Sequence, residues 1–226
     1  MNVEQLLDRL WEERAVAILR IGDHDVARDA MSAAVDGGFR IIEFTLGCPR
    51  PFELIEEFAA RDGLIVAAGT VLDPQDARRA FEAGARVIVS PVFDEEVVAT
   101  ALELGALAMP GAHTPTELLR AHRAGAQTQK LFPPPAGGPQ FVRATLGPLP
   151  FLRMVPTSGV TPENVAQWIS AGVFAVGFVG PLFPAEVLEQ RDYHEVERLA
   201  REALAAAKAI PRERPRSGSE AYASMS

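Results

Sequence analysis

Short apolar runs rich in β-branched residues recur along the chain, and longer amphipathic segments separate them. Continuous apolar character over so few residues is typical of a strand that is buried on both faces. Eight such runs occur, at residues 16–20, 41–46, 64–71, 87–91, 107–111, 128–133, 152–159 and 174–180. The pattern therefore predicts eight strands.

The segments between these runs carry helix signals. The segment at 23–38 ends in two glycines, a common way to end a helix. Asp73 stands before a proline at the start of another segment, and Thr-Pro pairs open those at Thr114 and Thr161. We therefore expect helices between the strands.

Strands that alternate with helices over short connections indicate parallel strands joined by right-handed crossovers. Eight such repeats in about 200 residues fit a closed (β/α)8 barrel, the TIM-barrel form of the α/β class. A doubly wound open sheet is the alternative, but no GxGxxG or GxxxxGK[ST] motif follows any of the runs. An extra helix at 3–14 is expected to cover the bottom of the barrel.

Length and composition predict one domain. With 226 residues, 48% of them hydrophobic, the chain can bury one sizeable core. We assign this single (β/α)8 domain to residues 1–210. Residues 211–226 are polar and rich in Pro, Gly and Ser, which predicts a disordered tail.

Charge and cysteine content narrow the class of partner. The formal net charge of −8 offers no general attraction for nucleic acid or for an anionic membrane. One cysteine, Cys48, cannot form an internal disulfide, and the first residues do not show the basic and apolar regions of a signal peptide. We therefore expect a cytoplasmic protein that binds a small molecule and neither nucleic acid nor membrane.

The distribution of lysine gives the first candidate for chemistry. The 22 basic residues include two lysines, Lys130 and Lys208, so 20 are arginines. Lys208 falls on the polar side of an amphipathic segment and needs no special explanation. Lys130 instead sits in the apolar run TQKLFP, where a charged amine is costly unless something uses it.

Reactive groups of a barrel of this kind project from the carboxyl ends of its strands. Arg20, Glu43, Thr70 and Lys130 all lie at such ends and are expected to converge on one cavity. Desolvation and a nearby cation favour the neutral amine, which can form a Schiff base with a ketone and so labilise the adjacent carbon–carbon bond. Glu43 would move the protons, while Arg20 and Thr70 would bind a substrate carboxylate.

Each assignment has a plainer alternative. Lys130 could face outward and pair with a helix carboxylate, and Glu43 could merely neutralise Lys130. Thr70 could cap a turn. The four histidines show no metal-ligand spacing, and His113 is interpreted as a loop residue. The Schiff-base chemistry described above requires neither a metal nor a cofactor.

Several ordered motifs together resemble a known family. They are AILR, GGFRIIEFTL, AAGTVLDPQ, EAGARVIVSP, MPGAHTPTEL, KLFPPPAGGPQFVRATLGPLP, VPTSGVTPENVAQWISAG and AVGF. The sequence is similar to the 2-keto-3-deoxy-6-phosphogluconate (KDPG) and 4-hydroxy-2-oxoglutarate (KHG) aldolases, class I enzymes on a (β/α)8 barrel. The resemblance implies that Lys130 forms the Schiff base, that Glu43 is the acid/base residue and that Thr70 contacts the pyruvyl carboxylate. It also implies a homotrimer.

The chain departs from the family pattern in two places. Many members carry an arginine four residues after the glutamate, where this sequence has Gly47, so carboxylate binding is expected to fall to Arg20. The family holds phosphate on backbone N–H groups of a Thr-Gly-Gly turn and a Gly-Ser turn. These turns read Thr157-Ser158-Gly159 and Phe178-Val179-Gly180-Pro181 here, and proline has no N–H. We therefore predict weakened phosphate recognition.

The catalytic residues are thus predicted to be Lys130 and Glu43. The substrate-binding set comprises Arg20, Thr70, Pro91, Phe132, Thr157, Ser158, Gly159 and Gly180. The predicted activity is reversible cleavage of a 2-keto-3-deoxy sugar acid, or of 4-hydroxy-2-oxoglutarate, to pyruvate and an aldehyde. A sugar-phosphate isomerase or epimerase that uses Glu43 as a base, and a ligand-binding barrel without turnover, are the alternatives.

Overall fold

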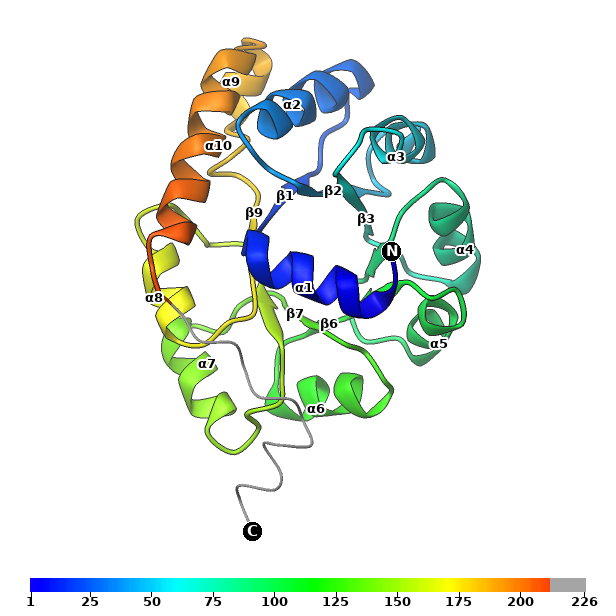
Figure 1. The fold of residues 1–226 in the computed structure, drawn as a ribbon, viewed down its shortest axis with the longest axis vertical. Helices are drawn as coiled ribbons and strands as arrows, with labels where there is room; N and C mark the ends of the chain where they lie inside the picture. The colour runs from blue at the N-terminus through cyan, green and yellow to red at the C-terminus, as the bar shows by residue number, and fades with distance from the viewer. Residues whose placement is uncertain (212–226) are drawn as a thin grey trace.

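The computed structural model describes residues 1–211, and strands and helices alternate along them (Figure 1). The tail predicted for 211–226 lies outside the described residues apart from Pro211. The strands are β1 (Ala15–Leu19), β2 (Ile41–Thr45), β3 (Ile65–Gly69), β4 (Val87–Val89), β5 (Leu107–Met109), β6 (Gly111–Ala112), β7 (Gln129–Leu131), β8 (Met154–Pro156) and β9 (Val176–Phe178). The helices are α1 (Val3–Glu13), α2 (His24–Asp36), α3 (Pro51–Ala59), α4 (Pro74–Glu82), α5 (Glu95–Glu103), α6 (Pro115–Arg123), α7 (Pro139–Leu146), α8 (Val165–Ser170), α9 (Ala185–Glu189) and α10 (Tyr193–Lys208).

The prediction of a closed eight-stranded barrel is wrong. The strands form a six-stranded parallel sheet in the order β5-β4-β3-β2-β1-β9 and a three-stranded parallel sheet in the order β6-β7-β8. An isolated bridge pairs Thr157, just after β8, with Gly177 in β9. Each predicted run contains strand residues, but the hydrogen-bonded ladder divides into two sheets.

Pro110 marks one of the two divisions. The run predicted at 107–111 splits at this residue into β5, which pairs with β4, and β6, which pairs with β7. Proline cannot donate to a ladder, so a strand that contains one is interrupted at that point. The hydrophobic pattern did not reveal the break, because the residues on both sides of Pro110 are equally buried.

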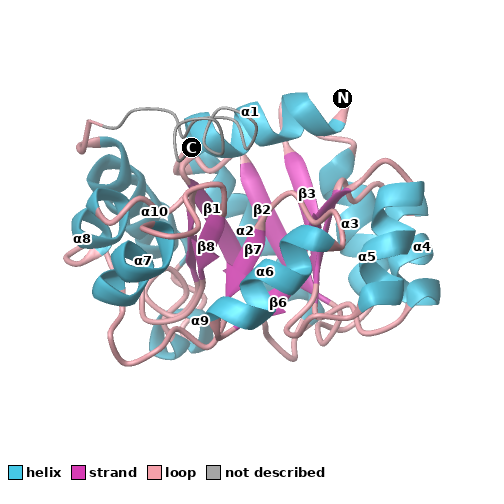
Figure 2. Cartoon of the chain, turned by 90° about the horizontal axis from the view of Figure 1, so that it is seen from below, coloured by secondary structure: helices cyan, strands magenta, loops and turns pink. Residues whose placement is uncertain are grey.

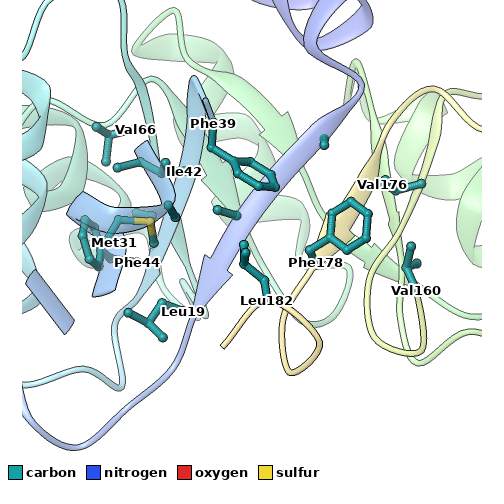
Figure 3. Packing of buried hydrophobic residues seen from close by; sticks show 14 of the residues in the cluster. Leu19, Met31, Phe39, Ile42, Phe44, Val66, Val160, Val176, Phe178 and Leu182 are labelled. Atoms are coloured by element: carbon teal, nitrogen blue, oxygen red, sulfur yellow. The ribbon is translucent and has the colours of Figure 1, made fainter. Parts of the chain in front are cut away.

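Successive strand residues contribute to two separate apolar layers. In β1, Ala15, Ala17 and Leu19 pack toward the helices, whereas Val16 and Ile18 face the interior between the sheets. In the outer layer Phe39 meets Phe178 edge-to-face with ring centroids 6.2 Å apart (Figure 3). Burial on both faces explains why the strands read as continuous apolar runs.

Helix α1 covers one end of the strands, as the sequence predicted (Figure 2). Its Leu6 and Leu10 are buried in the interior layer beside Ile41 and Ile65, the first residues of β2 and β3. The amino-terminal ends of the strands are therefore closed by apolar contacts. Access to the interior is left to the opposite, carboxyl-terminal end.

The helix signals correspond to observed caps. The side chains of Asp23, Asp73 and Asp94 accept hydrogen bonds from the third residue that follows each of them. Thr114 forms a capping box with Glu117 at the start of α6. The helix expected to open at Thr161 instead begins at Val165, after a turn. Among the helices of residues 1–211, none is long and apolar enough to cross a membrane.

Candidate active site

A cavity of about 390 Å³ opens at the carboxyl-terminal ends of the strands. It is lined by Ile18, Arg20, Glu43, Thr45, Thr70, Pro91, Lys130, Phe132, Thr157, Ser158, Gly159, Val179, Gly180 and Pro181. All ten residues that the sequence selected as catalytic or substrate-binding are in this set. The floor, with Glu43 and Lys130, is buried, whereas Arg20 and Gly180 are exposed at the mouth.

Lys130 and Glu43 form a buried pair on the cavity floor. Lys130 lies in β7 and Glu43 in β2, and Nζ of Lys130 lies 3.4 Å from Oε1 of Glu43. Lys130 is 7% exposed and Glu43 is 2% exposed. Nζ also lies 5.5 Å from the centroid of the Phe132 ring. The alternative in which Lys130 points outward to a helix carboxylate does not hold.

Arg20 and Thr70 lie together on another part of the wall. Nη2 of Arg20 donates a hydrogen bond to Oγ1 of Thr70 at 3.2 Å. Thr70 follows β3 and has a φ of 63°, in the left-handed region that non-glycine residues seldom adopt. Among the described residues that line the cavity, Arg20 and Lys130 are the two with cationic side chains. This corner can accept one carboxylate through a guanidinium and a hydroxyl.

The turn after β8 lines the cavity mouth with the exposed residues Ser158 and Gly159. Ser158 and Gly159 have φ angles of 78° and 71°. Asn164 holds this turn, because its Nδ2 donates to the Gly159 carbonyl at 2.8 Å and its Oδ1 accepts from the Thr161 amide at 2.9 Å. Within residues 1–211 the amides of Ser158, Gly159 and Gly180 donate no hydrogen bond, so all three are available to a ligand.

Thr157 supplies a hydroxyl without a partner. The residue is 3% exposed, and its Oγ1 is buried with no hydrogen-bond partner among the described residues. A buried hydroxyl left unpaired is costly, so a polar group of a bound ligand would stabilise it. The sequence placed Thr157 in the binding set, and the residue lines the cavity.

Two other residues with reactive side chains, Cys48 and His113, lie off the cavity wall. Cys48 is buried, and its Sγ lies 3.6 Å from the Leu19 carbonyl. His113 places Nδ1 2.6 Å from the Pro133 carbonyl and is not among the lining residues. Residues 1–211 contain no group of three or more His, Cys, Asp or Glu side chains that could hold a metal ion.

The family of the chain follows from its match to a sequence model. The model described as KDPG and KHG aldolase matches residues 6–199, most of the chain. This chain belongs to that family. It is therefore an aldolase, an aldehyde-lyase, and the sugar-phosphate isomerase and the non-catalytic barrel are excluded as alternatives.

Individual relatives agree with this family. The aldolase is 37% identical over 204 residues to the 2-dehydro-3-deoxy-6-phosphogalactonate aldolase of Escherichia coli, covering 88% of this chain and 96% of the relative. It is 34% identical over 210 residues to the 2-dehydro-3-deoxy-phosphogluconate aldolase of Pseudomonas aeruginosa, covering 90% and 95%. A solved structure described as native KDPGal superposes with a TM-score of 0.79 at 34% identity, covering 86% of this chain and 94% of that one.

The sequence left some wall residues of the aldolase unassigned. Thr45 lines the cavity two positions after Glu43, and its Oγ1 lies 3.7 Å from Sγ of Cys48. The two-residue periodicity of a strand already placed Thr45 on the same face as Glu43, so that signal was present. Asn164 is not a wall residue but holds the turn after β8, and it carried no such signal, because its role depends on the folded turn.

Proposed function

We propose that this aldolase cleaves a 2-keto-3-deoxy sugar acid or a 4-hydroxy-2-keto acid through a Schiff base on Lys130, releasing pyruvate and an aldehyde. The observation that carries this proposal is the buried amine 3.4 Å from a buried carboxylate on the floor of an open cavity. The reaction uses only side chains and backbone of this chain, so we propose that it needs no metal and no cofactor.

The first half of the reaction joins amine and ketone. The neutral Lys130 amine adds to C2 of the substrate, and Glu43 delivers the proton that lets the resulting hydroxyl leave as water. A protonated imine remains.

The second half breaks the carbon–carbon bond. Glu43 removes the proton of the C4 hydroxyl, the C3–C4 bond breaks, and the electron pair of that bond moves into the imine. The aldehyde departs, Glu43 protonates the enamine at C3, and water releases pyruvate from Lys130.

Arg20 and Thr70 supply the carboxylate site in this proposal. The planar guanidinium of Arg20 can meet both carboxylate oxygens, and the Thr70 hydroxyl that it already contacts can donate to the same group. The carboxylate then anchors C1 on the wall, so that C2 faces Lys130. Gly47 offers no side chain that could share this role.

The remaining polar groups fit the aldehyde half of the substrate. The free hydroxyl of Thr157 is buried near the floor, and the free amides of Ser158, Gly159 and Gly180 lie at the mouth. A sugar acid that extends outward from C4 would contact the Thr157 hydroxyl first and the three backbone amides at the mouth last. Such amides suit a terminal phosphate or hydroxyl, and Pro181 beside them removes one donor.

Reductive trapping tests the proposal. Pyruvate with borohydride should attach a stable 1-carboxyethyl group to Nζ of Lys130, located by mass spectrometry of peptides. Lys208 should stay unmodified, because its side chain is 49% exposed and its amine is paired with Glu13 at 3.2 Å. Lys130→Arg should abolish both trapping and turnover, since a guanidinium stays protonated, whereas Lys208→Arg should change neither. Label on Lys208, or on no residue, would overturn the Schiff-base chemistry.

Assembly and location form a further part of the proposal. We propose a cytoplasmic homotrimer whose aldolase domain spans residues 1–210. Two exposed apolar side chains support contact between copies, since Leu72 and Val92, just beyond β3 and β4, are 57% and 54% exposed. Light scattering measures the assembly directly. A single-chain mass at micromolar concentration would refute the trimer.

A further inference from the structure

Gly69 lies on β3 directly beside the carboxylate of Glu43. In the β2–β3 register Glu43 pairs with Ala67, and Thr45 pairs with Gly69. Strand side chains lean along the strand direction, and a long side chain reaches the diagonal neighbour two positions on. A Cβ atom at position 69 would overlap Oε1 of Glu43 and would lie 2.7 Å from Cδ and 2.9 Å from Cγ. The Glu43 carboxylate therefore occupies the space that any side chain at 69 would fill.

The backbone does not require glycine at this position. Gly69 is a regular, buried strand residue and is absent from the residues of 1–211 with positive φ, whereas the next residue, Thr70, has one. Glycine inside a strand weakens the strand unless another group needs to approach closely. Here the group that approaches Gly69 closely is the Glu43 carboxylate, which also lies beside Lys130.

We propose that Gly69 is a positioning residue for Glu43. By having no side chain, Gly69 leaves room for the carboxylate at 3.4 Å from the Lys130 amine. Gly69 itself donates nothing to the substrate and acts only through Glu43. The inference rests on the proposed function, in which Glu43 moves the protons of the Schiff-base reaction.

Gly69→Ala is the perturbation that follows. Glu43 is 2% exposed and lines the cavity, so a methyl group at 69 displaces its carboxylate along the cavity floor. A displacement of about 1 Å in catalytic geometry lowers turnover by about 10²-fold. We expect kcat to fall by at least about tenfold, toward that value, with the KM for the keto acid near that of the unaltered enzyme. The rate of borohydride trapping at saturating pyruvate should fall in parallel.

A double-variant cycle separates positioning from general damage. Glu43→Ala removes Cγ, Cδ and the carboxylate oxygens, which include the three atoms nearest to the new methyl group. In that background Gly69→Ala should change neither the residual trapping rate nor the Tm. Gly22→Ala is the matched control, because nothing lies within 4 Å of a Cβ at Gly22 and its φ is not positive. It should leave kcat, KM and Tm unchanged.

Each outcome decides the inference. If Gly69→Ala fails to fold alone, recovery of a folded protein in the Glu43→Ala background supports the steric link, and continued misfolding overturns it. If Gly69→Ala lowers kcat and Tm equally in the unaltered and the Glu43→Ala enzyme, glycine at 69 is required by the strand itself and not by Glu43. A rise in KM with normal kcat would assign the effect to Thr70. If unaltered enzyme shows no trapping at Lys130, the proposed function fails, whereas normal trapping with a fully active Gly69→Ala refutes only the positioning role.

Discussion

We predict that Pro181 weakens phosphate recognition and that its replacement strengthens it. Pro181 lies at the cavity mouth beside Gly180. Among the described residues the amide of Gly180 donates no hydrogen bond, and no atom lies within 4 Å of the position that a Cβ would take at Gly180. Pro181→Ala would add one N–H next to this amide. A hydrogen bond to a charged group contributes about 1.5–3 kcal/mol, which is about 10- to 150-fold in rate or affinity. Since the mouth is partly exposed, we expect the lower end, about tenfold.

The assay compares kcat/KM for a 6-phosphorylated 2-keto-3-deoxy sugar acid with that for its dephosphorylated form. The ratio of the two values isolates the phosphate, because any loss of Schiff-base chemistry affects both substrates equally. Unaltered enzyme should show a small preference for the phosphorylated substrate, held by the amides of Ser158, Gly159 and Gly180. Pro181→Ala should raise that preference about tenfold through KM.

Two results would refute this reasoning. An unaltered enzyme that prefers the phosphorylated substrate by several orders of magnitude would show that the three free amides already form a complete anion site. A ratio that stays the same in Pro181→Ala would show that the missing N–H does not point at the phosphate. In either case the difference from the family's turn pattern would have no consequence for specificity.

Three further perturbations have defined outcomes. Glu43→Gln should lower kcat by about 10²–10⁴-fold and slow trapping by borohydride, and an effect confined to KM would reassign Glu43 to binding. Arg20→Ala should raise the KM for pyruvate about 10- to 100-fold with a smaller change in kcat, measured in the condensation direction, and unchanged affinity would refute the carboxylate site. Burial and the charge of Arg153 lower the pKa of His122 below its ordinary value of 6.5. As pH falls, His122 therefore takes up a proton in the unfolded chain before it does so in the folded protein. The free energy of unfolding, measured by urea denaturation at a series of pH values, should fall as pH drops below 6.5, and His122→Gln should reduce this dependence on pH.

The capped helix starts and the strand positions were predictable from the sequence because their causes are local. Asp73 and Thr114 cap helices through bonds to residues three positions away, so the signal and its effect lie within one turn. Strands buried on both faces produce continuous apolar runs whatever their neighbours are. Lys130 also stood out locally, because an isolated lysine in an apolar run needs a partner wherever the chain folds.

Contacts between distant segments were decided by the tertiary structure alone. The 3.4 Å approach of Lys130 to Glu43 joins residues 87 positions apart, and no pattern in either segment sets that distance. One of the two divisions between the sheets lies at Pro110, where the chain before it pairs with β4 and the chain after it pairs with β7. Gly69 is a further case. The sequence shows only a glycine in a strand, whereas the register of β2 against β3 puts the Glu43 carboxylate in the space a side chain would occupy. The residue types that carry the chemistry are thus a local property of the sequence, but their mutual geometry arises from packing between strands far apart along the chain.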